Sequence, residues 1–317
     1  MALASLGDER ALPSLLTALD TGTDAWRAVN AAGHLPQAAA ELAPRLARHL
    51  ADADFSGPWH GISAPALASA LSALGDPVIV PELTDTVRAA VRHKQWSETA
   101  YLLKAIAMFG TRAESALDIV RPLTDVEDVA LCTAATGALW ELERSPERVV
   151  PLLERLLDHN RNFDAIDLAG RVGPPAAAVL SRLRQILNEQ VEQNARNEQK
   201  GSAVLNDSWT LVHAASALWD IGGDGEAGIV VPALLNAWKN NGATARAAAA
   251  CLDLMGPAAR PAVLRIQAAL EQPHRSESLW SGGVAFDLEL QRSCRAVLTR
   301  LQDLPDHTPA EPTDSPS

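Results

Sequence analysis

Small and large apolar residues recur along this chain in a fixed order, at intervals of 29 to 49 residues. In each copy an alanine-rich segment ends on a large apolar residue, a turn follows, and a second apolar segment has a proline near its start. The two clearest copies pair Ala138–Leu142 with Val149–Leu153, and Ala217–Ile221 with Val230–Leu235. Self-similarity at such a period is typical of repeat architectures. The pattern therefore predicts an all-α array of about eight helical hairpins.

Each first helix is expected to end just before one marked position, here called the anchor. The anchors are Gly7, Pro36, Gly75, Gly110, Glu143, Gly173, Gly222 and Gly256. Six of the eight are glycine, which is expected where a helix ends on a left-handed residue. The copy at Glu143 lacks glycine, so the geometry of its turn is left open.

Small residues also recur, five positions before each anchor. Seven of the eight residues there are small, in the series Ala2, Ala31, Ala70, Ala105, Ala138, Leu168, Ala217 and Cys251. A small residue lets two helices approach closely, and larger neighbours fill the groove between them. We expect this row to bring the two helices of each hairpin together.

The second helices are expected after the anchors, with an apolar stripe at helical spacing. They are Leu12–Leu19, Leu42–Leu50, Pro81–Val91, Ala113–Leu123, Val149–Leu157, Pro175–Leu187, Val230–Trp238 and Ala258–Leu270. Seven prolines lie near the starts of these helices, where a missing N–H is harmless: Pro13, Pro44, Pro81, Pro151, Pro175, Pro232 and Pro261.

The two ends of the array differ. The first helix, Met1–Leu6, is only a stub, and a solenoid end needs a polar cap. We therefore expect upstream sequence or a partner to cover this end. An amphipathic helix over Phe286–Leu301 is a plausible cap at the other end. The expected organisation is a helical array over 1–301 and a disordered tail over 302–317, which is rich in proline and acidic residues.

The alanine-rich first helix, the apolar-glycine anchor and the Pro-x-Leu second helix resemble the HEAT repeat, in the variant seen in the phycobilisome-lyase-like (PBS lyase) HEAT family. The resemblance covers about Ala2 to Leu301 and departs from the pattern at Glu143. It implies an α–α superhelix, the armadillo-type fold, whose second helices line the concave face. It implies little about activity, because the family pattern encodes packing.

Composition narrows the range of functions. The net charge is −12, which disfavours nucleic-acid binding unless basic residues gather on one face. The three cysteines form no CxxC pair and are expected to be buried and reduced, which fits a cytoplasmic protein. The sequence shows no secretory signal and no apolar run of membrane-spanning length.

The candidate binding residues are basic side chains on the second helices, off the apolar stripes. They are Arg45, Arg48, Arg88, Arg92, Arg155 and Arg182, accompanied by His49 and Arg184. On a concave face they could form a basic groove for an acidic peptide or for phosphates. They could equally form a solvated face, paired with Asp85, Glu154 and Asp158. Both interpretations are kept.

Two long steps between anchors contain insertions, which often lie on the binding rim of a solenoid. The first, Ala51–Gly61, carries Trp59 and His60 as candidate contact residues, since tryptophan is enriched at binding hot spots. The second, Asn188–Asp207, is expected to extend the preceding helix and then become a polar loop near Lys200. The other tryptophans, including Trp26, Trp140 and Trp219, are interpreted as packing residues.

Several motifs suggest chemistry but have simpler interpretations. The DTG at Asp20–Gly22 occurs once, whereas an aspartic protease needs two such carboxylates, so it is read as a turn with Asp24 as the next N-cap. GGDGEAG at Gly222–Gly228 lacks the ligand spacing of an EF-hand and the lysine of a P-loop. Asp52, Asp54 and His60 are too few to predict a metal site. We expect no catalytic residue, no cofactor and no metal.

The sequence thus favours a non-enzymatic scaffold or adaptor that binds a protein or peptide, possibly acidic, on the concave face of a HEAT-like solenoid. Two alternatives rest on the resemblance alone. One is a bilin-lyase-like enzyme of the PBS lyase HEAT family. The other, disfavoured by the acidic charge, is a HEAT-like DNA glycosylase.

Overall fold

The protein is seen in a computed structural model that describes residues 2–55, 62–159, 162–201, 207–239, 242–271 and 283–302. Over these residues it consists of α-helices and short 3-10 helices without a strand, which confirms the all-α prediction. Contacts divide the chain into two compact units, Met1–Leu168 (unit 1) and Ala169–Ser317 (unit 2). Trp59, His60 and residues 303–317 of the tail lie outside the described residues.

Every predicted second helix of unit 1 is helical. Its α-helices are α1 (Leu12–Thr21), α2 (Ala25–Ala32), α3 (Ala39–Ala51), α4 (Ala64–Leu74), α5 (Val80–Arg92), α6 (Trp96–Ala107), α7 (Leu117–Leu123), α8 (Val129–Glu143) and α9 (Pro146–Leu156), and α10 (Phe163–Val172) crosses the unit boundary. The predicted stub at the start forms only the short 3-10 helix η1 (Ala4–Leu6), on which Leu6 is exposed.

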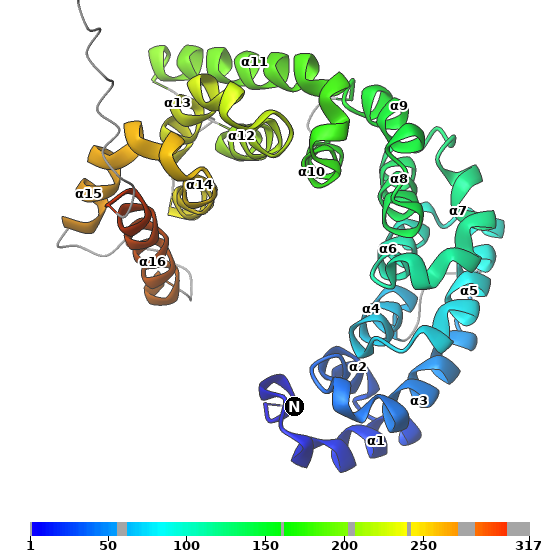
Figure 1. Ribbon diagram of the computed structural model, residues 1–317. Coiled ribbons are helices and arrows are strands. Elements are labelled where there is room, and N and C mark those ends of the chain that lie inside the picture. Colours follow the sequence, from blue (N-terminus) through cyan, green and yellow to red (C-terminus); the bar gives the residue numbers. More distant parts are fainter. Residues whose placement is uncertain are drawn as a thin grey trace, which may run out of the picture. The chain divides into compact units, whose positions relative to one another are not determined.

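The helices of unit 1 form two layers (Figure 1). The predicted first helices α2, α4, α6 and α8 contact one another in succession and form one layer. The second helices α1, α3, α5 and α7 do the same in the other layer. The apolar stripe of each helix lies between the layers, where Leu46, Leu67 and Leu83 are fully buried.

In unit 1 the pairing of helices between the layers differs from the prediction by one helix, whereas α12 (Ser208–Gly222) and α13 (Ala227–Trp238) of unit 2 pair as predicted. Between the two layers of unit 1, the extensive contacts join α1 with α2, α3 with α4, α5 with α6, and α7 with α8, so each pair consists of a second helix and the first helix after it. The anchor turn therefore joins one pair to the next. Short 3-10 helices such as η3 (Pro36–Ala38), η4 (Pro77–Ile79) and η5 (Gly110–Ala116) begin at or just after the anchors and separate the helices on either side.

The row of small residues has a corresponding role between stacked first helices. A Cβ added to Gly33, after α2, would lie 2.9 Å from Ala73 Cβ and 3.8 Å from Ala70 Cα on α4. Ser72 Oγ of α4 lies 2.9 Å from the carbonyl oxygen of Ala105 on α6. The small residues thus allow close approach within one layer, and not within the hairpins as expected.

The left-handed anchor turns are largely as predicted. Of the six anchor glycines, Gly7, Gly75, Gly110, Gly173 and Gly256 have positive φ. Gly222 has a right-handed backbone, and the residue after it, Gly223, has the positive φ instead, at 55°. Where the glycine is missing at Glu143, the next residue, Arg144, takes the left-handed conformation with φ 53°.

The prolines follow the prediction only in part. Pro13 and Pro81 occupy the first turns of α1 and α5, as expected. Pro44, Pro151 and Pro232 lie inside their helices because these helices begin several residues before them. All three are exposed, so each missing backbone N–H leaves the core unaffected.

Unit 2 contains η6 (Pro174–Val179), α11 (Leu180–Gln199), α12 (Ser208–Gly222), η8 (Gly223–Glu226), α13 (Ala227–Trp238), α14 (Gly242–Leu254), η9 (Gly256–Ala262), α15 (Val263–Glu271) and α16 (Gly283–Gln302). The long α11 confirms that the second insertion begins by extending a helix. Near its end, Asn194 is buried and its Oδ1 accepts a hydrogen bond from the Asp207 N–H before α12. The helix predicted at Phe286–Leu301 is α16, which packs on α14 and α15. None of the helices in the described segments is long and apolar enough to span a bilayer.

Candidate functional site

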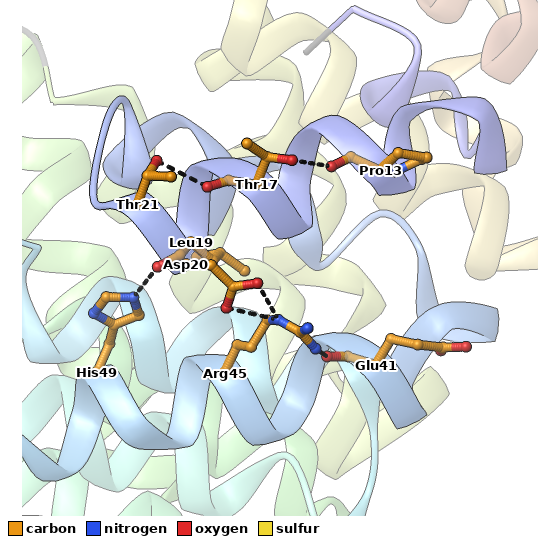
Figure 2. A network of polar contacts seen from close by, with 8 residues as sticks. All are labelled: Pro13, Thr17, Leu19, Asp20, Thr21, Glu41, Arg45 and His49. Atoms are coloured by element: carbon orange, nitrogen blue, oxygen red, sulfur yellow. Dashed lines mark hydrogen bonds and ion pairs between the residues drawn. The ribbon is translucent and has the colours of Figure 1, made fainter.

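The predicted arginines of unit 1 lie on its second-helix layer, here called the arginine layer and made of α1, α3, α5, α7 and α9. Arg45 on α3 holds the carboxylate of Asp20 on α1, with Nε 2.9 and 3.1 Å from its two oxygens, and Nη1 donates to the Glu41 carbonyl at 2.9 Å. Beside it, His49 Nε2 lies 2.8 Å from the carbonyl oxygen of Leu19 (Figure 2).

This network stabilises the C-terminal end of α1. Leu19 lies in the last turn of α1, where carbonyl oxygens lack helical partners. His49 therefore satisfies a carbonyl that the helix leaves free, and Arg45 ties α3 to the same turn. Asp20 of the DTG motif is thus an ion-pair partner. Asp24 stands at the N-cap of α2 with a left-handed backbone (φ 56°), but its side chain makes no capping hydrogen bond.

Arg88 and Arg155 make equivalent links further along the arginine layer. Arg88 on α5 pairs with Asp85 at 2.7 Å and with Asp118 of α7 at 2.8 Å. Both carboxylates raise the pKa of Arg88, and Asp118 has the larger effect. Arg155 on α9 donates to the carbonyl of Thr124, after α7, at 2.7 Å and lies 3.2 Å from Asp125, whose carboxylate raises the pKa of Arg155. The pairing of Arg88 with Asp85 is the one that the solvated-face interpretation expects.

Sequence reasoning missed most of these carboxylate partners. Arg45 and Asp20 are 25 residues apart, and Arg88 and Asp118 are 30 apart. Arg121 on α7, not singled out from the sequence, likewise binds Glu143 at the end of α8 at 2.5 Å. A search for acidic residues about one repeat away from each arginine would have found these pairs.

Arg48 and Arg92 differ from Arg45, Arg88 and Arg155 in their lack of a carboxylate partner among the described residues. Both are exposed, at the ends of α3 and α5, and neither makes an ion pair or hydrogen bond with any residue that the structure describes. The arginine layer therefore contains arginines that are paired with a carboxylate and a smaller number of arginines that have no carboxylate partner among the described residues.

The two predicted arginines of unit 2 lie on α11. Arg182 is half-buried. Arg184 forms a two-pronged ion pair with Glu226 of η8, with Nε 2.9 Å from Oε2 and Nη2 on Oε1. Glu226 is buried, and the guanidinium lowers the pKa of its carboxyl against the opposing effect of burial. The ion pair between Arg184 and Glu226 therefore fixes the GGDGEAG turn to α11.

The opposite layer of unit 1 exposes large side chains, among them Trp26, which was expected to be a packing residue. Trp26 on α2 is 55% exposed, Tyr101 on α6 is 61% exposed, and Met108, just after α6, is 60% exposed. Between them, α4 exposes only the small side chains of Ser69 and Ala73. These five residues are here called the aromatic surface. The packing interpretation of Trp26 is wrong, whereas Trp140 is buried as expected.

The described residues contain no cluster of metal-ligating side chains. All three cysteines are buried and free, and burial raises the pKa of the Cys251 and Cys294 thiols to about 11. Such thiols are poor nucleophiles at neutral pH.

Comparison with known proteins adds no relative: no family model, curated protein or solved structure matches the chain.

Proposed function

We propose that the chain is a HEAT-like α-solenoid that acts as a non-enzymatic scaffold and binds a partner protein on the aromatic surface of unit 1. Two features support the solenoid: helix pairs repeat in two layers, and left-handed turns recur at the anchors. In such arrays each pair contacts its neighbours and the stacked pairs present a long surface. The buried free thiols fit a reducing, cytoplasmic setting.

The exposure of Trp26, Tyr101 and Met108 carries the proposal. These side chains contribute little to the core, because more than half of each is in contact with solvent. Covering a large apolar side chain stabilises a complex by about 1.5–3 kcal/mol, and tryptophan and tyrosine are enriched at binding hot spots. The small residues of α4 leave room for a partner's side chains between them.

Quantitative co-purification with the full-length chain, in an extract of its natural source, tests the proposal. Trp26→Ala combined with Tyr101→Ala is expected to reduce recovery of the specific partner at least tenfold, since each hot-spot truncation costs about 1–2 kcal/mol.

Trp209→Ala is the matched control, because Trp209 is an aromatic residue of unit 2 that is 43% exposed. This variant should recover the partner as the wild type does. Equal recovery by the double variant, with its circular dichroism spectrum unchanged, would exclude the aromatic surface.

A further inference from the structure

The arginine layer of unit 1 contains both paired and unpaired basic side chains. Most of its basic side chains are neutralised by a specific carboxylate: Arg45 by Asp20, Arg88 by Asp85 and Asp118, and Arg155 by Asp125. These arginines are occupied in holding neighbouring helices together. They have little charge left to offer a ligand.

Among the described residues at the ends of α3 and α5, three arginine and lysine side chains have no carboxylate partner. Arg48 near the end of α3, Arg92 at the end of α5 and Lys94 just after it are all exposed. Within the described residues, no carboxylate lies at ion-pair distance from any of them. Asp52, four residues after Arg48, is also not at ion-pair distance. Residues 56–61, outside the described residues, contain neither aspartate nor glutamate.

The three side chains belong to adjoining ends of two packed helices. α3 and α5 are neighbours in the arginine layer (Figure 1). The segments that follow them are joined, because Gln95 Nε2 donates to the carbonyl of Phe55 at 3.1 Å. Basic residues at helix C-termini favour the helix dipole, but this interaction leaves the charge exposed and able to bind an anion.

We propose that Arg48, Arg92 and Lys94, here called the open basic patch, bind an acidic segment of a partner protein. Guanidinium groups bind carboxylates in a two-pronged geometry, which Arg48 and Arg92 are free to adopt. An acidic peptide is a better match than a nucleic acid, because three basic side chains are few for the regular run of phosphates that a nucleic acid presents. This inference goes beyond the proposed function, since the aromatic surface lies on the other layer.

Fluorescence anisotropy with the full chain tests the patch directly, with a labelled short polyglutamate peptide and a polyglutamine peptide of equal length as probes. The wild type should bind polyglutamate and not polyglutamine. Arg48→Gln combined with Arg92→Gln should weaken binding about tenfold, at about threefold for each exposed charge pair. Binding should also weaken as salt rises, because about 0.15 M salt screens exposed charges beyond about 8 Å.

Arg121→Gln combined with Arg155→Gln is the matched control. It removes the same charge from the same layer, but at arginines paired with Glu143 and Asp125. It should leave polyglutamate binding within twofold of the wild type. Equal weakening by both variants would show that only overall charge matters and would overturn the patch. So would tighter binding of a DNA oligonucleotide than of polyglutamate, or an unchanged affinity in Arg48→Gln with Arg92→Gln.

Discussion

At the scale of single residues, arginine has two distinct uses in this chain. Where a carboxylate lies on a neighbouring helix, the guanidinium holds two helices together. Arg184 and Glu226 are the extreme case, because the glutamate is buried and the guanidinium forms a two-pronged ion pair with its carboxylate. A buried carboxylate that loses such a partner is strongly destabilised.

The Arg184–Glu226 pair makes stability depend on pH. Arg184 lowers the pKa of Glu226 in the folded protein. The pair therefore stabilises the fold fully above the ordinary glutamate pKa of about 4.3, and its contribution is lost as pH falls through the lowered value. Glu226→Gln should cost about 1–2 kcal/mol at pH 7. Urea unfolding at pH 7 and pH 3 should show this difference shrinking at acid pH, and a difference independent of pH would contradict the role.

At the scale of helices, periodicity predicted the elements well and their neighbours only in part, since α12 and α13 pair as predicted. The apolar stripes and anchors located every second helix, the extension of α11 and the left-handed turns, because these depend on local sequence. The pairing of α3 with α4, and the stacking of α2 on α4 through Gly33 and Ala70, could not be read in this way. A stripe shows which face is buried but not which helix covers it. The exposure of Trp26 could not be predicted for the same reason, because the sequence does not show which helices cover α2.

Close packing of helices can be tested at Gly170 on α10. A Cβ there would lie 3.2 Å from Ala217 Cα of α12 and 3.0 Å from an Asp220 oxygen. Gly170→Leu should therefore destabilise by about 1–3 kcal/mol, through overpacking. Gly228→Leu is the control, because Gly228 is helical and a Cβ there meets nothing within 4 Å. Its stability should be unchanged or higher, owing to better helix propensity. Equal effects of the two substitutions in thermal unfolding would refute close packing at Gly170.

At the scale of the whole molecule, contacts separate the chain into two units, each with its own buried leucines. Unfolding of such a chain need not be a single transition. Leu46 in unit 1 and Leu234 in unit 2 are both fully buried, and truncation of either should cost about 2–4 kcal/mol. In guanidinium unfolding followed by circular dichroism, Leu46→Ala and Leu234→Ala should each lower a different midpoint. A single transition shifted by both would mean that the units unfold together.

The two layers of unit 1 are held by interactions of different physical character. Ion pairs across the arginine layer are exposed, so they weaken as salt rises. The first-helix layer is held by close contact between small side chains, which salt does not screen. Salt should therefore affect the arginine layer more than the first-helix layer. The aromatic surface lies on the first-helix layer, so binding of a partner to Trp26 and Tyr101 should depend little on ionic strength.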